Sequence, residues 1–174
     1  MSKAYLGCDV GSKGFLTLQY DGIFEYYSIA DNDLYQLSKI MTDIRSRFQQ
    51  IACVIEDVHS IFGSSAKATF NFGFNKGYLV GLLSANNIPY TLVSPKQWQK
   101  EIWTNADMVI NYKKVTIRGK EITKKEINTK QTSINAAKRL FPTADFRRTE
   151  RCSNIDDNKV DATLMSEYAR RKNL

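Results

Sequence analysis

Residues 5–29 have the sequence YLGCDVGSKGFLTLQYDGIFEYYSI, which predicts three short strands in succession. The runs 5–10, 15–20 and 23–29 are rich in aliphatic and aromatic side chains, as strands of a half-buried sheet are. Glycines turn the chain after the first run. The dipeptide Asp-Gly between the second and third runs is a strong hairpin signal. We therefore expect an antiparallel three-stranded meander at the start of the chain.

Helices and strands alternate in the rest of the chain. The spacing of apolar residues predicts, in order, a helix over 32–50, a strand over 51–55, a helix over 64–87, a strand over 90–93, and helices over 95–103, 129–140 and 155–171, the last capped by Ser153 or Asn154. This order predicts an α/β fold with a five-stranded mixed sheet, three antiparallel strands followed by parallel ones, and helices on both faces. It resembles the ribonuclease H-like arrangement. A chain of 174 residues suits a single domain over 1–174.

The net charge of +7 is concentrated in the middle of the chain. Residues 95–151 hold 14 Lys and Arg against 6 Asp and Glu, whereas the segments on either side are close to neutral. This predicts a basic face of the kind that binds phosphate backbones, although a solvated basic surface is the alternative. The densest cluster lies in 104–127, where we expect a hairpin or a mobile loop. Its candidate DNA-binding residues are Lys113, Lys114, Arg118, Lys120, Lys124 and Lys125.

The cellular location is predicted from what the sequence lacks. No run of about 18 apolar residues is present for a membrane span, and the first residues lack the apolar stretch of a signal peptide. We therefore expect a cytosolic protein. The three cysteines, Cys8, Cys53 and Cys152, are odd in number and far apart, so we expect free, buried, small apolar side chains.

Two acidic residues lie in or at the end of predicted strands. Asp9 interrupts the apolar run 5–10 just before a glycine turn, where a turn-initiating Asp is the alternative. Glu56 follows the run 51–55, and a carboxylate at the carboxyl end of a buried strand faces the crevice in which α/β sheets bind ligands. Asp57 alternates to the other side of the pleat, so only one of this pair can face Asp9. We expect that residue to be Glu56.

Two more acids lie on the last predicted helix. Asp157 and Asp161 continue the helical spacing of Leu164 and Met165, so all four share the face that a helix turns toward the core. Capping of the helix N-terminus is an alternative reason for an acid at Asp157, but it cannot explain the acid at Asp161. Charges about 4 Å apart repel by about 4 kcal/mol at an effective dielectric near 20. Four converging carboxylates therefore predict a divalent metal that neutralises them, with Mg²⁺ favoured by carboxylate oxygens.

Three stretches together resemble the RuvC-like Holliday junction resolvases, in particular the short phage-type members. They are GCDVGSKG at 7–14, VIEDVH at 54–59 and DNKVDATLMSEYARR at 157–171, with weaker similarity in FNFGFNKGYLVGLL, IPYTLVSPKQWQK and TKQTSINAAKRLFP. The resemblance spans nearly the whole chain. It implies a Mg²⁺-dependent endonuclease that resolves four-way DNA junctions by paired nicks, acting as a homodimer in a bacterial cytoplasm or a phage-infected host cell.

The resemblance also implies roles for individual residues. By position, Asp9, Glu56, Asp157 and Asp161 would be the ligands of two Mg²⁺ ions, for which Mn²⁺ is a possible substitute. Lys130, in TKQTS, matches the family's lysine near the scissile phosphate and can stabilise negative charge there. An exposed helix lysine is the alternative for that position.

The sequence departs from the family pattern in three places. The second basic position near PKQWQK falls at Gln99, between Lys96 and Lys100, which are candidate DNA-binding residues. Some members space the helix acids at i and i+3, a register that would select Asn158 in place of Asp157. The basic stretch 104–127 resembles an insertion.

Two features bear on the substrate and on assembly. Phe62, after Glu56, resembles the aromatic residue that family members insert at the junction crossover, although a core phenylalanine is the alternative. Gly73, Gly77 and Gly81 recur every four residues along the predicted helix 64–87. Such a row of small residues permits close approach of another helix, and a second subunit could supply it.

Other functions fit parts of the pattern. A less selective nuclease, acting on flaps, forks or the RNA of hybrid duplexes, would need the same residues. A catalytically silent junction binder would need only the basic face. A sugar kinase or actin-like ATPase also begins with a D-x-G strand turn, but it needs a second such domain and a second phosphate motif, which the sequence lacks. The four acids favour a metal-dependent nuclease over the silent binder, and nothing in the residues separates its possible substrates.

Overall fold

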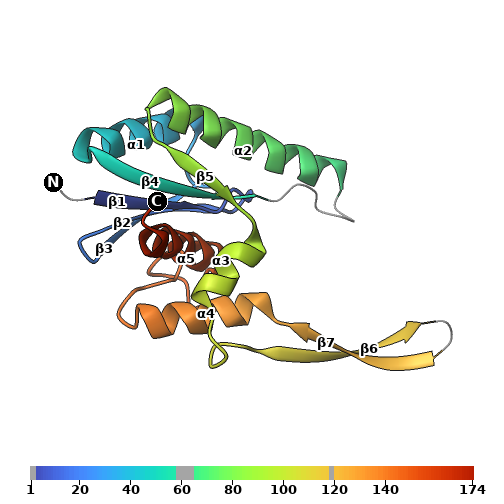
Figure 1. Cartoon of the computed structure of the whole chain (residues 1–174). Helices are drawn as coiled ribbons and strands as arrows, with labels where there is room; N and C mark the ends of the chain where they lie inside the picture. The colour runs from blue at the N-terminus through green and yellow to red at the C-terminus, as the bar shows by residue number, and fades with distance from the viewer. Residues whose placement is uncertain (1–2, 58–64, 118–119) are drawn as a thin grey trace.

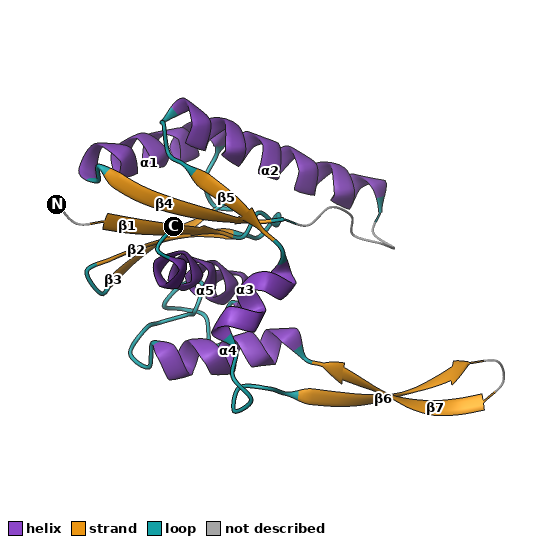
Figure 2. Ribbon diagram, in the orientation of Figure 1, coloured by secondary structure: helices purple, strands orange, loops and turns teal. Residues whose placement is uncertain are grey.

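The computed structural model describes residues 3–57, 65–117 and 120–174, which form a five-stranded sheet covered by helices and a separate two-stranded sheet (Figures 1 and 2). The elements, in chain order, are β1 Lys3–Cys8, β2 Phe15–Tyr20, β3 Ile23–Ser28, α1 Leu34–Arg47, β4 Gln50–Glu56, α2 Ala66–Ala85, β5 Tyr90–Val93, α3 Pro95–Ile102, β6 Ile110–Ile117, β7 Lys120–Ile127, α4 Thr129–Leu140 and α5 Asp157–Lys172. In the described residues, no helix has the length and apolar character needed to cross a membrane.

The main sheet has the strand order β3-β2-β1-β4-β5. β1, β2 and β3 pair antiparallel, whereas β4 pairs parallel with both β1 and β5. The turn between β2 and β3 is made by Asp21 and Gly22, both with positive φ, as a two-residue hairpin with right-handed strand twist requires. The predicted α/β class and five-stranded mixed sheet are confirmed.

Helices cover both faces of this sheet, as predicted (Figure 1). On one face, α1 and α2 bury Met41 and Leu79 against strand residues such as Leu6. On the other, α5 and the shorter helices α3 and α4 form a second core, which includes Trp98 and Leu164. The central strands are therefore apolar on both sides, which explains why β1 and β4 are nearly continuous apolar runs.

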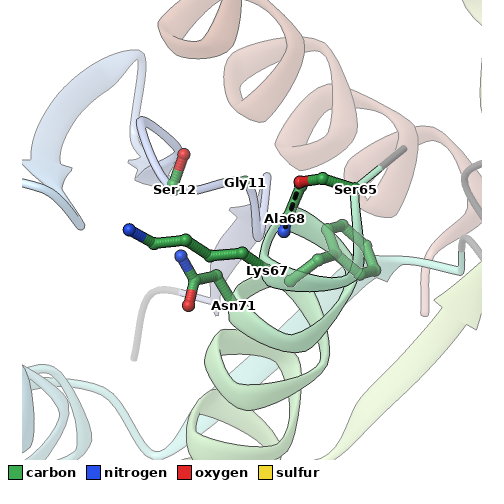
Figure 3. A pocket seen from close by; sticks show the side chains of 7 residues that line it. Gly11, Ser12, Ser65, Lys67, Ala68 and Asn71 are labelled. Atoms are coloured by element: carbon green, nitrogen blue, oxygen red, sulfur yellow. Dashed lines mark hydrogen bonds between the residues drawn. The ribbon is translucent and has the colours of Figure 1, made fainter.

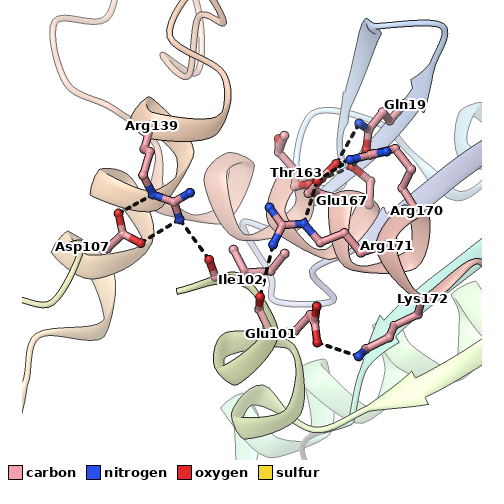
Figure 4. Close-up of polar contacts among 11 residues, drawn as sticks. Gln19, Glu101, Ile102, Asp107, Arg139, Thr163, Glu167, Arg170, Arg171 and Lys172 are labelled. Atoms are coloured by element: carbon pink, nitrogen blue, oxygen red, sulfur yellow. Dashed lines mark hydrogen bonds and ion pairs between the residues drawn. The ribbon is translucent and has the colours of Figure 1, made fainter. Parts of the chain in front are cut away.

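α5 lies unusually close to β1. A side chain at Gly7 would place its Cβ 2.0 Å from the backbone oxygen of Ala162 and 2.5 Å from the backbone nitrogen of Ser166. Gln19 of β2 donates to Glu167 at 3.2 Å, and Glu167 also pairs with arginines of its own helix (Figure 4). This packing fixes where the first turn of α5 lies relative to the end of β1.

Some predicted boundaries are wrong by a few residues. β1 ends at Cys8, so Asp9 follows the first strand and does not lie within it. α1 begins after Asp33, whose side chain forms a capping box with Gln36, and it is therefore shorter than the predicted 32–50. α5 is capped by Asp156, which accepts from the backbone of Asn158, and not by Ser153 or Asn154.

The cysteines are free, but only two are core residues. Cys8 and Cys53 are buried, with their sulfur atoms 3.6 Å apart on neighbouring strands. Cys152 is only half-buried, in the loop before α5, and the prediction of a core side chain is wrong there. Its loop position, outside any apolar run, is the physical reason.

Residues 104–127, for which the sequence left a hairpin and a mobile loop open, contain β6 and β7. The two strands pair antiparallel along their whole length, with Lys113 opposite Lys124 and Tyr112 opposite Lys125. The pair extends away from the main sheet and leads into α4 (Figure 1). Of the two predicted alternatives for this stretch, the hairpin is therefore the one observed.

The glycine row lies on the outer face of α2. An added Cβ at Gly73, Gly77 or Gly81 would meet nothing within 4 Å, and all three residues are exposed. The buried side of the helix carries Leu79 and Leu83 instead. Within the described part of this chain, the glycine row therefore contacts no other helix.

We predict that Gly7→Ala lowers the free energy of unfolding by about 3 kcal/mol, because the new methyl group forces α5 away from β1. Urea unfolding of the metal-free protein measures the change. The matched control is Gly81→Ala, on an open helix face, which should raise stability by up to about 1 kcal/mol. Equal effects from the two substitutions would show that α5 does not pack on β1 in this way.

Candidate functional site

Asp9 is held in a tight turn at the end of β1. Its backbone nitrogen donates to the Phe15 oxygen at 3.0 Å, and its side chain accepts from the Gly11 nitrogen at 3.2 Å. A side chain at Gly14 would place its Cβ 2.0 Å from the Asp9 backbone oxygen, so a glycine is needed there. The turn therefore fixes the carboxylate of Asp9 on the side of the sheet that Gly7 presents to α5.

Glu56 is the last residue of β4 and the neighbour of Asp9 across the sheet. The pairing of Cys8 with Ile55 makes Asp9 and Glu56 the next pair along these parallel strands. The indole nitrogen of the buried Trp98 donates to Glu56 at 3.0 Å. Asp57 instead pairs with Lys76 of α2 at 2.5 Å. The two acids thus diverge as the pleat predicts, and Glu56 is the one on the Asp9 side.

Asp157 and Asp161 come from the first two turns of α5. The Oδ1 atom of Asp161 is buried and has no hydrogen-bond partner among the described residues. Lys130, near the start of α4, places its ammonium 2.5 Å from Asp157, while 74% of its own side chain stays exposed. Asn158, the alternative to Asp157, directs its amide to Asp156 instead. Lys130 is the nearest described cation to this group of acids.

The pKa values of Asp9 and Asp161 are raised by burial and by the other acids of this region. Burial, reinforced by the charges of Glu56 and Asp157 and opposed by the Gly11 hydrogen bond, raises the pKa of Asp9 to about 7. Burial raises the pKa of Asp161 to about 8, opposed by Ser133 and reinforced by the charges of the other three acids. Burial also raises the pKa of Glu56, and the Trp98 hydrogen bond opposes it. Asp9 and Asp161 are therefore desolvated, and the charges of Glu56 and Asp157 act on both.

The donor set has the chemistry of a Mg²⁺ site. All four side chains offer carboxylate oxygens, and the buried Oδ1 of Asp161 lacks the partner that a cation would supply. However, over residues 3–57, 65–117 and 120–174 no group of three or more His, Cys, Asp and Glu side chains is arranged so that it could hold a metal ion. The carboxylate oxygens and the burial of Asp161 suit a Mg²⁺ ion, but the four side chains are not gathered into a coordination shell.

Three residues of this region were not predicted from the sequence. Trp98 orients Glu56, and Asp156 caps α5 and raises the pKa of Asp9. Arg148 lies over the Phe15 ring at 4.9 Å and donates to the Lys13 oxygen at 3.3 Å. The pair of acids at 156–157 and the basic run before α5 were the available signals. Neither pattern specifies which side chains meet.

Two hollows flank the turn that follows Asp9. One, of about 510 Å³, is lined by Lys13, Arg148 and Arg151 together with Asp157. The other, of about 390 Å³, lies between the turn and the start of α2, where Lys67 and Asn71 point toward Ser12 (Figure 3). Three basic side chains therefore share a hollow with Asp157, and one lysine lines the other hollow; none of these four was among the predicted DNA-binding residues.

The remaining predicted residues lie at the surface or outside the described ranges. Lys96 and Lys100 are exposed on α3, while Gln99 between them is half-buried. The described hairpin lysines Lys113, Lys114, Lys124 and Lys125 are exposed as well. Lys120 begins β7. Phe62 and Arg118 fall outside the described residues.

Known structures share the fold of this chain. Thermus thermophilus RuvC in complex with a Holliday junction substrate aligns with a TM-score of 0.56, over 98% of this chain and 96% of that one, at 10% sequence identity. The chain has the RuvC fold. A second structure of Thermus thermophilus RuvC aligns with a TM-score of 0.50, over 99% and 97% of the two chains, again at 10% identity. No protein-family model matches the sequence, and no curated protein matches it. The predicted ribonuclease H-like fold of RuvC is thus confirmed.

We predict that the metal-free protein loses stability as the pH rises from about 4 to about 8. The folded chain keeps protons on Asp9 and Asp161 at pH values where the unfolded chain has released them. The free energy of unfolding should therefore fall by up to about 1.4 kcal/mol per pH unit for each group. Urea titrations in the presence of a chelator measure this slope.

Asp161→Asn should flatten that dependence, because it removes one of the two titrating groups. Glu101→Gln is the control: the pKa of Glu101 is lowered by Lys172, so its share of the stability is complete above its usual pKa. An Asp161→Asn variant with the wild-type slope would contradict the assignment of a buried, protonated Asp161.

Proposed function

We propose that this protein is a Mg²⁺-dependent, structure-selective DNA endonuclease that resolves four-way junctions by paired nicks. The observation that carries the proposal is the pair of desolvated acids Asp9 and Asp161, on which the charges of Glu56 and Asp157 act, in a RuvC fold. One solved RuvC with this fold was captured with a Holliday junction substrate. The basic hollows beside the acids suit a phosphate backbone.

The four acids would hold two Mg²⁺ ions, with Mn²⁺ as a possible substitute. Such a pair, when bound, activates a water on one side of a phosphodiester and stabilises the leaving oxygen on the other. The chain contributes the desolvated pocket, which strengthens every charge interaction within it. Trp98 keeps one oxygen of Glu56 turned toward the indole, so the other remains for a cation.

Lys130 has a separate role in this proposal. Its ammonium contacts Asp157 while most of its side chain faces solvent, so it can move between the carboxylate and an incoming phosphate. The Asp157 contact raises the pKa of Lys130 and keeps it cationic. A cation at this position can stabilise the negative charge that develops on the phosphate during cleavage.

Several basic and aromatic residues would hold the DNA. Those beside the acids are Lys13, Lys67, Arg148 and Arg151, and the more distant ones are Lys96, Lys100 and the hairpin residues Lys113, Lys114, Arg118, Lys120, Lys124 and Lys125. Phe62 stays a proposed wedge at the crossover, since aromatic side chains stack on unpaired bases. The sites of action would be a bacterial cytoplasm or a phage-infected cell.

A homodimer suits the substrate, because a four-way junction has two strands to cut and a two-fold dimer has two sites. The outer face of α2 supports this assembly. Beside the glycine row it carries Phe70 and Phe74, which stack with ring centroids 6.4 Å apart. Phe70 is 71% exposed, so the apolar face lacks a cover within the described chain.

Cleavage of a synthetic four-way junction in the presence of Mg²⁺ tests the proposal. Wild type should produce paired nicks in opposite strands. Glu56→Gln should lower the rate roughly a thousandfold, as expected when about 4 kcal/mol of transition-state stabilisation is lost. The neighbouring Asp57→Asn should retain most of the rate, because that side chain pairs with Lys76.

Two results would redirect the proposal. If Glu56→Gln and Asp161→Asn cut as fast as wild type, these acids are not the catalytic group. Wild-type protein that binds the junction and never cuts it, with Mg²⁺ or Mn²⁺, would be a silent junction binder. A panel of flaps, forks and RNA/DNA hybrids run beside the junction identifies a less selective nuclease by its preferred substrate.

We predict that wild type is a dimer in light-scattering measurements and that Gly77→Arg is a monomer. The arginine places a long charged side chain on the open glycine row. The monomer should still nick each strand of the junction, but the nicks in opposite strands should no longer occur together. Ser46→Arg, at an exposed position of α1, is the control and should stay dimeric. An unchanged mass for Gly77→Arg would exclude this face as the interface.

A further inference from the structure

We propose that the hollow between β3 and the loop after α4 is a binding site for a small aromatic carboxylate, with Lys159 as the residue that holds the carboxylate. The hollow lies at one edge of the main sheet, where β3 is the outermost strand. Neither the metal-dependent chemistry nor the DNA contacts proposed above use it. The inference therefore goes beyond the proposed function and does not rest on it.

Aromatic rings form much of the wall of this hollow. It has a volume of about 550 Å³, and its lining includes Phe24, Tyr26, Leu140, Phe141, Pro142 and Lys159. The rings of Phe24 and Phe141 meet edge to face with centroids 4.8 Å apart, and the Phe24 ring is nearly parallel to the Tyr26 ring at 6.2 Å. Hollows of roughly this size, with apolar walls and a few polar groups, are where proteins bind small molecules. A flat apolar ligand suits these walls, because aromatic rings pack well on one another.

Lys159 is a buried charge without a counter-charge. Asp107, Lys159 and Glu167 are the charged residues of the described chain with less than a tenth of their surface exposed, and Lys159 is 8% exposed. Asp107 pairs with Arg139 at 2.8 Å, and Glu167 pairs with Arg170 at 2.7 Å. Lys159 forms no ion pair with any described residue. Because a buried charge without a partner is strongly unfavourable, an anion in the hollow would supply what Lys159 lacks.

The ammonium of Lys159 can serve one more acceptor. It donates to the backbone oxygen of Arg147 at 2.9 Å and lies over the Tyr26 ring, 4.1 Å from the centroid. An ammonium has three N–H donors, so these two contacts leave one unused. The neighbouring acids already have partners. The Arg147 side chain holds both carboxylate oxygens of Asp145, and Asp156 accepts from the first backbone nitrogens of α5.

The single ammonium indicates which kind of anion fits. A carboxylate brings one negative charge, which one ammonium balances. A phosphate monoester brings nearly two charges and three strong acceptor oxygens, more than Lys159 alone can satisfy. Asp145 also lines the hollow, and its carboxylate repels a second negative charge. The hollow therefore favours a monoanion that carries an aromatic group, and neither a bare anion nor a neutral ring meets both conditions.

The hollow is separate from the acids of the candidate site. Lys159 follows Asp157 by two residues on α5, but it contacts Tyr26 of β3, whereas Asp157 contacts Lys130 of α4. In the sheet, β2 lies between β3 and β1, the strand that leads into Asp9. A carboxylate bound at Lys159 would thus leave the acids accessible to a metal ion and to DNA.

Three probes test the proposal. Naphthoate has the ring and the charge, naphthamide has the ring without the charge, and acetate has the charge without the ring. Wild type should bind naphthoate roughly tenfold more tightly than naphthamide, because a hydrogen bond between two charged groups contributes about that factor. Acetate should not saturate over the same concentration range. Protein NMR titrations measure these affinities, and the largest shifts should fall on the rings of Tyr26 and Phe141, which line the hollow.

Lys159→Met tests the ammonium itself, because methionine keeps much of the side-chain volume and removes the charge. This variant should lose the preference for naphthoate over naphthamide, while its affinity for naphthamide stays within about twofold of wild type. The matched control is Lys39→Met. Lys39 also lies over a tyrosine ring, that of Tyr35 at 4.5 Å, but it is exposed on α1, on the other face of the sheet. The control should keep the full preference.

Equal affinities of wild type for naphthoate and naphthamide would overturn the proposal, as would a Lys159→Met variant that keeps the preference. NMR shifts confined to residues away from the hollow would overturn it as well. The comparison of probes and the location of the shifts need only wild type, so they decide the question even if Lys159→Met does not fold. A saturating four-way junction should leave the naphthoate affinity unchanged, whereas displacement of naphthoate would make the hollow part of a DNA surface and refute a separate site.

Discussion

Close packing of α5 against β1 is the constraint on which the candidate site depends. Because Gly7 has no side chain, the backbone of α5 at Ala162 lies directly over the strand. Gln19 of β2 holds the far end of the same helix through Glu167. Asp161, one residue before Ala162, is thereby placed beside Asp9 at the end of β1. A helix standing farther from the sheet would leave its acids and those of the strands on separate surfaces.

Desolvation then determines what this group of acids can do. Carboxylates that are buried beside one another have raised pKa values, so near neutral pH they hold protons or require a cation. Among the described residues Lys130 contacts the group from its exposed side, while Lys13 and Arg148 line a neighbouring hollow. Negative charge at the centre and positive charge around it is the distribution expected where a metal ion and a phosphate backbone meet.

The hairpin extends this charge distribution beyond the body of the fold. Its lysines lie on a two-stranded sheet without a core, whereas its base is fixed to α4 by Asp107 and Thr132. The RuvC fold thus carries the acids, and the hairpin carries a second group of charges apart from them.

Local patterns in the chain were sufficient to predict the five strands of the main sheet, because short apolar runs bounded by turn residues permit few other structures. Alternation along β4 also distinguished Glu56 from Asp57, and helical spacing placed Asp161 inward. The contacts of Trp98 with Glu56 and of Arg148 with Ser28 had no such signal. The two members of each hydrogen bond are 42 and 120 positions apart in the chain, respectively, and contacts between such distant residues produce no periodic pattern in the sequence. How deeply each carboxylate is buried, and therefore its charge at neutral pH, follows from how the helices pack on the sheet.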